Sequence, residues 1–333
     1  MLSIVSHIDV TVKSNIVTDT GAVAPDSPKW RDKKRQSVII ARKLHKAGLH
    51  KRSEAVMACG NIIKYVLCPD CGRYRVVKAS LCHDRLCPVC IWRRAINRCA
   101  TVQSALDYLI SEYDGYNYYL MTLTCLNCEP SELSKAVKDM NEAWAKLRRR
   151  SCFKCIDGWA RSFECTYNEH KHTLHPHHHY LLMSRKSLNE SELEDIIRNW
   201  MELCPRPTDR KAQNVHTFVA DSADTDDTKK FCEKVLECFK YTQKYEDLDN
   251  MPVGEFRLYA AQIAHVRAVA YGGIIKQAIA YLGMSEEDKE DEPEETSICY
   301  NCKSSRLLRL IARWSFGEEQ YKVIDQYTAN DAV

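Results

Sequence analysis

The segment that most constrains the fold is residues 173–183, TLHPHHHYLLM, in which histidines run directly into apolar residues. If this segment is a β-strand, side chains alternate between its two faces, so His177 and His179 point the same way. The apolar residues that follow indicate that the strand lies in a core. Two imidazoles on one face form half of a metal site, because imidazole is the commonest metal-ligating side chain.

A second strand is predicted just upstream, at Gly158–Asn168, where polar and apolar residues alternate and aromatic types are frequent. The connection to the histidine segment has the length of a hairpin loop. Glu164 can then face His177 and His179 from the neighbouring strand, although a lone glutamate in a strand is more often simply exposed. Two histidines and a carboxylate leave coordination positions open and suit Mg²⁺ or Mn²⁺.

The cysteine content bears on both compartment and metal binding. The chain has 17 cysteines in 333 residues, with no stretch long enough to span a membrane and no signal peptide at its start, so we expect a cytoplasmic protein. Cytosolic cysteines are seldom paired in disulfides. This many cysteines therefore indicates bound metal, with the remainder serving as small buried side chains.

Two C-x2-C pairs lie close together in the first hundred residues: Cys68 with Cys71, and Cys87 with Cys90. Their spacing is that of a four-cysteine site, and Zn²⁺ takes four thiolates in tetrahedral geometry. We therefore predict one zinc site from these two pairs. Cys59 and Cys82 are further candidates, so a shifted set in which they replace the first pair stays open. Arg93 and Arg94 follow the second pair and could lie on a DNA backbone.

Three further C-x2-C pairs occur, at Cys125/Cys128, Cys152/Cys155 and Cys299/Cys302. None has a second pair nearby in the sequence, so each is weaker support for a metal site. The last pair follows an acidic run at 285–295 and could complete another site with one of the other two.

Residues 228–245 predict an amphipathic helix on which Glu237, Tyr241 and Tyr245 are spaced four apart and share one face. A tyrosine can act as a covalent nucleophile, and a glutamate one turn away can act as a general base. The plain alternative is a helix whose tyrosines pack with an exposed polar tip. Two lysines flank Tyr241 and could hold phosphate oxygens: Lys240 and Lys244.

The remaining pattern predicts strands at 116–124 and 215–220 and helices at 130–150, 187–203 and 259–282, the last interrupted at Gly272 and Gly273. Strands paired in hairpins with helices between them indicate an α+β fold, an antiparallel sheet with flanking helices, beside a small zinc-binding module. The net charge of +3 does not by itself indicate nucleic acid. Residues 30–52 are strongly basic and could bind phosphates or form an ordinary charged helix face.

Four segments occur in the order found in the HUH endonucleases, and within that superfamily the chain resembles the rolling-circle replication initiators of small plasmids. They are LCHDRLCPVCIWRR (81–94), MTLTCLN (121–127), HPHHHYLLM (175–183) and ECFKYTQK (237–244). They resemble, in turn, the zinc segment, the first strand motif, the histidine–hydrophobic–histidine motif and the tyrosine motif of the plasmid branch. One position departs from the family pattern, because the residue between the metal histidines is usually apolar and here is His178.

The resemblance implies an HUH nuclease fold and a metal-dependent mechanism. A metal on His177, His179 and Glu164 would polarise the scissile phosphate of single-stranded DNA. Tyr241 would attack the phosphorus and become linked to the 5′ phosphate, and the released 3′ hydroxyl would prime synthesis. Glu237 would end the round by activating water or assisting hydroxyl attack. The implied partners are plasmid origin DNA, a host helicase and a host DNA polymerase, with no membrane.

On this basis four segments are expected: a basic amino-terminal segment (1–55), a zinc-binding module (56–100), the nuclease domain (101–284), and an acidic linker with a carboxy-terminal tail (285–333). Two other functions stay open. A transposase of the same superfamily would use the same chemistry on a mobile element. A zinc-ribbon DNA-binding regulator without catalysis would explain the cysteines but neither the histidine strand nor the tyrosine helix.

Overall fold

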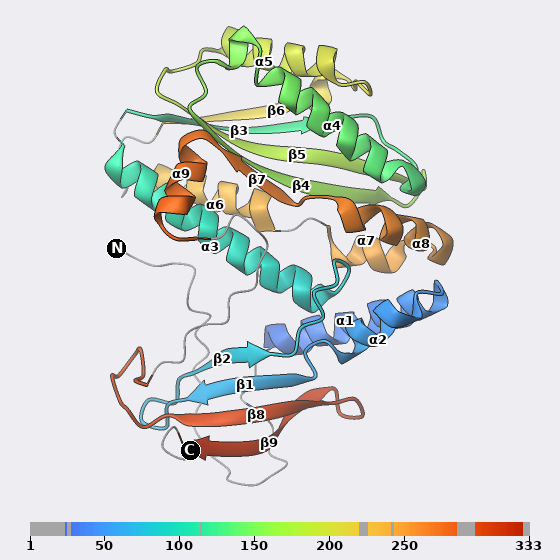
Figure 1. Ribbon diagram of the computed structural model, residues 1–333, viewed down its shortest axis with the longest axis vertical. Helices are drawn as coiled ribbons and strands as arrows, with labels where there is room; N and C mark the ends of the chain where they lie inside the picture. Colours follow the sequence, from blue (N-terminus) through green and yellow to red (C-terminus); the bar gives the residue numbers. More distant parts are fainter. Residues whose placement is uncertain are drawn as a thin grey trace. The chain divides into compact units, whose positions relative to one another are not determined.

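Two antiparallel sheets form the framework of the computed structural model, which describes Ala24 and residues 28–113, 115–219, 226–240, 243–284 and 297–328. The chain divides into two compact units, one of Met1–Trp92 with Glu290–Val333 and the other of Arg93–Lys289. Each unit contains one of the sheets (Figure 1). The expected α+β class with antiparallel sheets and flanking helices is confirmed.

The first unit has a four-stranded sheet in the order β2-β1-β8-β9. Its elements are α1 (Pro28–Lys46), α2 (His50–Ala58), β1 (Ile62–Leu67), β2 (Tyr74–Ala79), β8 (Leu308–Ser315) and β9 (Gln320–Thr328). The basic segment around α1 is an amphipathic helix, since Ile40, Ala41 and Leu44 are fully buried at helical spacing.

The end of the chain is not the tail that the sequence indicated. Strand β8 pairs with β1 in a regular antiparallel ladder, with Lys64 opposite Ile311, and β9 pairs with β8. The two units therefore divide the chain differently from the four expected segments. Local patterns could not reveal this, because the partner of β8 lies more than two hundred residues earlier in the chain. The acidic run at 285–295 lies outside the described residues.

The second unit has a five-stranded sheet in the order β6-β3-β5-β4-β7, antiparallel throughout. Its strands are β3 (Asn117–Thr124), β4 (Gly158–Asn168), β5 (Thr173–Ser184), β6 (Asn214–Val219) and β7 (Val269–Gly272). Its helices are α3 (Pro88–Glu112, of which the residues up to Trp92 belong to the first unit), α4 (Leu133–Leu147), α5 (Glu190–Leu203), α6 (Asp226–Lys240), α7 (Tyr245–Asn250), α8 (Val253–Gln262) and α9 (Gly273–Tyr281).

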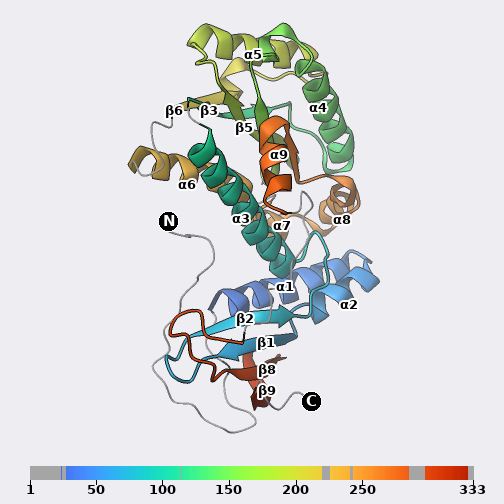
Figure 2. The same ribbon diagram turned by 60° about the vertical axis from the view of Figure 1, so that its left-hand side comes forward.

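Helices cover both faces of this sheet, with α4 and α5 on one side and α3, α6 and α9 on the other (Figures 1 and 2). On the second side, Leu181 of β5 belongs to a core that includes Phe239 of α6 and Ile279 of α9. On the first side, the Trp144 ring of α4 stacks on Tyr180 of β5, with ring centroids 3.9 Å apart. Because both faces are covered, the central strands are buried along most of their length.

Two predicted helices are wrong in part. Residues 259–282 do not form one interrupted helix, because Val269–Gly272 is strand β7 and pairs with the edge of β4. Apolar content alone could not distinguish the two, since a short apolar run suits a buried strand as well as a helix. The predicted helix over 228–245 is also divided, and α6 ends at Lys240. Lys244 has an extended backbone, and Tyr245 begins α7.

Candidate active site

Three predicted metal ligands meet on the sheet face that α3, α6 and α9 cover. Glu164 of β4 lies opposite His177 of β5 in the strand register, and His179 follows two residues later on the same face. A Glu164 carboxylate oxygen lies 3.2 Å from His177 Nε2 and 3.0 Å from His179 Nε2. The ligand atoms of all three lie within 4.8 Å of one another, as a metal-binding group requires.

Hydrogen bonds at the Nδ1 atoms orient the imidazole rings of His177 and His179. His177 Nδ1 lies 3.3 Å from the carbonyl oxygen of His175, which can only accept, so Nδ1 carries the proton. His179 Nδ1 lies 2.9 Å from the Thr122 hydroxyl on β3. Both contacts turn the Nε2 atoms towards Glu164, but the Thr122 hydroxyl can donate or accept and so orients the His179 ring without setting its tautomer. Two imidazole nitrogens and a carboxylate oxygen at these distances can share a cation, either a proton or a metal ion.

The protonation of Glu164 follows from this arrangement. Burial by itself raises the pKa of its carboxyl, but hydrogen bonds and charge from His177 and His179 outweigh burial and hold the pKa well below its usual range. The carboxyl is therefore ionised at neutral pH. A buried anionic oxygen beside two imidazoles suits a divalent cation.

The neighbouring histidines have other surroundings. His178 points to the opposite face, where it is fully buried and its Nδ1 lies 3.0 Å from the Tyr180 hydroxyl. Burial lowers the pKa of His178 well below its usual value, so the ring is neutral. His175 shares the face of the metal-ligand group, but its Nδ1 lies 2.9 Å from Asn127 Oδ1. Strand alternation thus separates His178 from the group.

Tyr241 lies outside the described residues, as does the side chain of Lys240. The preceding turn of α6 is described, and the carbonyl of Cys238 accepts a hydrogen bond of 2.5 Å from the Ser162 hydroxyl on β4. Burial raises the pKa of Cys238 to about 12, with a further contribution from the nearby charge of Glu164. The end of α6 therefore lies beside the candidate metal-binding group. Glu237 is exposed on the same turn.

Tyr245 does not share a helix with Glu237. It is the first residue of α7, and its hydroxyl donates a 3.0 Å hydrogen bond to Asp249 in the same helix. Burial, followed by this contact with Asp249, raises the pKa of Tyr245 to about 12. Lys244 immediately precedes α7. The expectation that Glu237 and Tyr245 lie on one helix face is therefore wrong.

The predicted zinc set is divided between two cysteine groups, both in the first unit. One group is Cys59, Cys82, Cys87 and Cys90, and the other is Cys68, Cys71, Cys299 and Cys302. Cys68 and Cys71 therefore do not join Cys87 and Cys90, and the shifted set that the sequence left open is the one that forms. The reason lies in the fold, since Cys68 and Cys71 lie in the turn between β1 and β2, whereas Cys87 and Cys90 lie at the start of α3.

The first cysteine group has a polar environment that the sequence did not reveal. The Ser37 hydroxyl of α1 lies 3.5 Å from Cys87 Sγ, and the buried Lys34 donates a 2.7 Å hydrogen bond to the carbonyl of Cys59. A cation next to several thiols favours their ionised, metal-binding form. Only the packing of α1 against this group places Ser37 and Lys34 there, so no sequence spacing could identify them.

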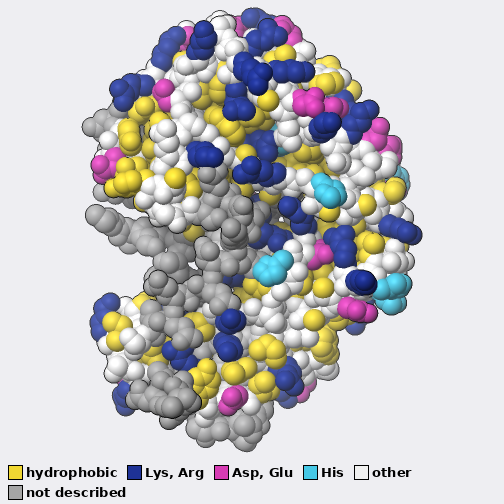
Figure 3. Space-filling model, viewed as in Figure 1, with side chains coloured by type: hydrophobic (Ala, Val, Ile, Leu, Met, Phe, Trp, Pro, Cys, Tyr) yellow, Lys and Arg dark blue, Asp and Glu magenta, His cyan; other side chains and the backbone are white. Residues whose placement is uncertain are grey.

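Two of the predicted DNA-contact residues lie in the long helix α3. Arg93 and Arg94 lie in α3 and are half-buried. Lysine and arginine side chains are spread over the face of the molecule seen in Figure 3 and are not gathered in one patch. None of the described helices is long and apolar enough to cross a membrane.

Comparison with known proteins identifies the family. The family described as "Replication protein" (Rep_1) matches residues 73–322, which is most of the chain and includes every described strand of the second unit. The chain belongs to this replication protein family. The match confirms the resemblance to plasmid rolling-circle Rep proteins that the four motifs indicated.

Several curated relatives carry the name "Protein rep". One from Streptococcus pneumoniae is 26% identical over 310 residues, covering 88% of this chain and 91% of the relative. Another from Bacillus amyloliquefaciens is 26% identical over 324 residues, covering 88% and 93%. One from Lentilactobacillus hilgardii is 24% identical over 329 residues, covering 93% and 99%. No solved structure matches the chain significantly. Family and names support a plasmid replication initiator.

Proposed function

We propose that this replication initiator nicks and rejoins one strand of its plasmid origin DNA through a covalent 5′-phosphotyrosine intermediate. The observation that carries the proposal is the convergence of His177, His179 and Glu164 on one sheet face. Two imidazoles and one carboxylate leave open coordination positions, as catalysis on a phosphate requires. A magnesium or manganese ion at this site would polarise the scissile phosphate when bound.

Tyr241 is the proposed nucleophile, and chain connectivity supports it. It comes three positions after Cys238 in the chain, and the Cys238 carbonyl accepts a hydrogen bond from the Ser162 hydroxyl on β4. After Tyr241 the chain returns to the same strand, where Asp247 accepts a hydrogen bond from the Tyr167 backbone amide. Glu164 lies between these two contact points on β4. The described chain before and after Tyr241 thus contacts the strand that carries Glu164, which supports Tyr241 as the residue that would attack the phosphate.

Other residues of this region receive supporting roles. Glu237, one turn before Tyr241, would activate water or assist hydroxyl attack at the end of the round. Lys240 and Lys244 would hold phosphate oxygens. Arg93 and Arg94 would contact the DNA backbone. The 3′ hydroxyl released by nicking would prime a host polymerase, with a host helicase opening the duplex.

The cysteine group Cys59, Cys82, Cys87 and Cys90 is the proposed site for a structural zinc ion. Two of its sulphur–sulphur distances, Cys59 to Cys90 and Cys82 to Cys90, are 3.6 and 3.7 Å. The edge of a zinc–thiolate tetrahedron with Zn–S of about 2.3 Å is about 3.8 Å. These thiols therefore fit zinc. The ion would stabilise the first unit and not take part in DNA cleavage.

The decisive test is nicking of supercoiled plasmid carrying the cognate origin, with Mn²⁺ present. We expect Tyr241→Phe to fold normally but to form no covalent DNA adduct on a denaturing gel, because only the phenol oxygen is removed. Tyr245→Phe is the matched control and should form the adduct as the parent does. Adduct formation by Tyr241→Phe but not by Tyr245→Phe would make Tyr245 the nucleophile. Nicking by both variants at parental rate would refute the covalent mechanism.

The role of Glu237 has a separate readout. Glu237→Ala should still make the first cleavage, because nucleophilic attack by Tyr241 does not need it. It should accumulate the adduct, because release at the end of the round is impaired. Time courses of adduct formation and decay separate the two steps. Equal adduct lifetimes in the parent and in Glu237→Ala would remove Glu237 from the mechanism.

The binding-only regulator makes the opposite prediction. It would bind origin DNA and leave the plasmid intact in every metal ion tested. The transposase alternative would keep the chemistry but would join its own element ends in preference to a plasmid origin. Family membership favours the replication initiator over both.

A further inference from the structure

The second cysteine group joins segments from opposite ends of the chain. Cys68 Sγ lies 3.5 Å from Cys302 Sγ, and Cys71 Sγ lies 3.6 Å from Cys299 Sγ, although the latter two residues are 228 positions apart in the sequence. All four sulphur atoms lie within 4.8 Å of one another. Disulfide sulphurs would be about 2.05 Å apart, whereas the edge of a zinc–thiolate tetrahedron is about 3.8 Å. The spacing is that of a metal site.

The two C-x2-C segments have the same local structure. In each, the backbone N–H after the second cysteine donates to the carbonyl of the first, at 2.8 and 2.9 Å: Gly72 to Cys68, and Lys303 to Cys299. Gly72 and Lys303 both have a positive φ, of 69° and 61°. This conformation is common for glycine and uncommon for lysine. Two matching turns that each present two sulphurs to a shared centre form a pair of metal-binding knuckles.

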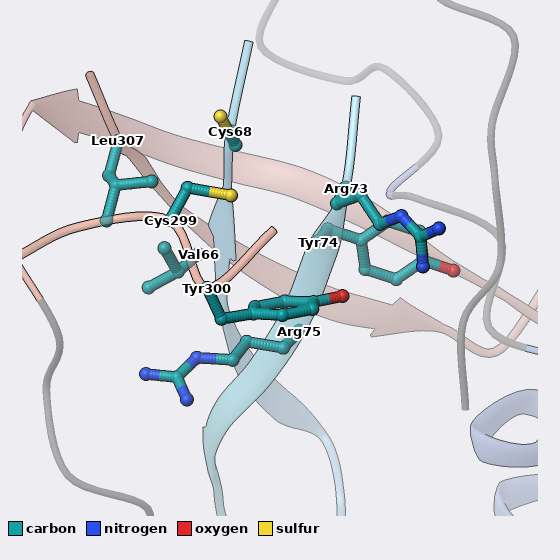
Figure 4. Close-up of a pocket in the computed structure, with 8 residues that line it drawn as sticks. All are labelled: Val66, Cys68, Arg73, Tyr74, Arg75, Cys299, Tyr300 and Leu307. Atoms are coloured by element: carbon teal, nitrogen blue, oxygen red, sulfur yellow. The ribbon is translucent and has the colours of Figure 1, made fainter. Parts of the chain in front are cut away.

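The surroundings of the sulphurs are those of a closed structural site. The buried side chains of Val66, Val77 and Leu307 pack with Cys68 and Cys299. Figure 4 shows the Cys68 and Cys299 sulphurs near each other, with Val66 and Leu307 beside them. These apolar side chains shield Cys68 and Cys299, and four thiols would leave no open coordination position, unlike a catalytic site.

A polar contact outside the thiols also links the two knuckles. Asp70, between the first two cysteines, forms an ion pair with Arg306 and accepts a hydrogen bond from the Ser304 hydroxyl. These groups are exposed, so the ion pair contributes little by itself. The two cysteine segments are therefore in contact through these side chains as well as through the sulphur atoms.

We propose that Cys68, Cys71, Cys299 and Cys302 bind a second zinc ion, separate from the one at the first cysteine group. Four thiolates in tetrahedral arrangement select zinc over Mg²⁺ or Mn²⁺. The ion fastens the segment before β8 to the turn between β1 and β2. It thereby keeps the β8–β9 hairpin in the first unit, although the whole second unit lies between these strands in the sequence.

The test is metal content of the full-length protein, measured by inductively coupled plasma mass spectrometry after dialysis. We expect two zinc ions per chain in the parent and one in Cys302→Ser, which alters an exposed ligand. Cys155→Ser is the matched control, because Cys155 also belongs to a C-x2-C pair but to no four-cysteine group, and it should keep two. Cys82→Ser should lose the other zinc ion.

A second measurement uses only the parent protein and therefore does not depend on how well the variants fold. The purified parent protein is stripped of metal and loaded with Co²⁺, whose absorption spectrum reports tetrahedral thiolate coordination. The loaded protein is then alkylated to find which cysteines the metal protects. We expect Cys299 and Cys302 to be protected only when metal is present. One zinc ion per parent chain, iron in place of zinc, or a Cys302→Ser variant that retains two zinc ions would each overturn the proposal. So would free alkylation of Cys299 and Cys302 in the metal-loaded protein.

Discussion

At the scale of single residues, the candidate metal group depends on partners that do not bind the metal themselves. The Thr122 hydroxyl contacts Nδ1 of His179, and the backbone carbonyl of His175 contacts Nδ1 of His177. Such contacts fix the ring orientation before metal binds. Their loss typically weakens metal binding by about 10–100-fold.

We therefore expect Thr122→Val to weaken Mn²⁺ binding by about 10–100-fold, because the valine keeps the shape but removes the hydroxyl. Thr122→Ser should restore most of the affinity. The measurement is a Mn²⁺ titration followed by electron paramagnetic resonance. Equal affinity of Thr122→Val and the parent would mean that the hydroxyl does not orient His179.

His179→Ala removes a proposed ligand and should abolish both Mn²⁺ binding and nicking. His216→Ala is a suitable control, since His216 is exposed on β6 of the same sheet and lies outside the metal-ligand group. It should bind Mn²⁺ and nick as the parent does. Nicking by His179→Ala at the parental rate would contradict the proposed site.

The lowered pKa of Glu164 gives a pH prediction for the metal-free protein. A carboxyl with a folded pKa below its unfolded value of about 4.3 adds stability above that value and loses it as the pH falls through the folded pKa. The melting temperature of the parent should therefore exceed that of Glu164→Gln at pH 5–6, and the gap should shrink below about pH 4. Thermal melts in chelator from pH 3 to 6 test this. A gap that widens in acid would contradict the assignment.

At the scale of elements, β7 depends on the absence of a side chain at one position. A Cβ atom at Gly272 would lie 2.3 Å from the Trp159 ring of β4. Strand β7 pairs with β4 through this same residue, with Gly272 opposite Trp159. The close approach of a bulky ring to the backbone therefore requires glycine here.

Gly272→Ala should destabilise the protein by about 1–3 kcal/mol, as overpacking of a well-packed site does. Gly254→Ala is the control, since a Cβ atom there meets nothing within 4 Å and Gly254 lies in α8. It should be neutral or slightly stabilising. Denaturant unfolding gives both values. Equal stability of the two variants would show that Trp159 can move aside at little cost.

The elements also show where local sequence patterns sufficed. The strands carrying Glu164 and the histidines form at almost the predicted bounds, because alternation and aromatic content act locally. Helix α5 begins at a capping box between Asn189 and Glu192, which is likewise a local signal. Strand β7 was predicted as helix, because its strand character comes from pairing with β4.

At the scale of the whole molecule, the protein combines two kinds of candidate metal-binding group. Glu164, His177 and His179 in the second unit offer three ligands and would leave coordination positions open, whereas each cysteine group of the first unit offers four thiols. Brief treatment with EDTA should therefore abolish nicking while zinc remains bound, and added Mn²⁺ should restore activity. Metal analysis of the treated protein checks the zinc. Nicking that survives complete removal of divalent metal other than zinc would contradict the assignment.

The sequence by itself determined the α+β class and the grouping of Glu164 with His177 and His179. Strand alternation and hairpin length are local properties, so the sequence alone is enough to recognise them. It also predicted cysteine-based metal binding, but not which cysteines combine. Cys68 and Cys71 meet Cys299 and Cys302 only because β8 pairs with β1 across most of the chain. Such long-range pairing depends on which strands share a core, and only the tertiary structure decided it.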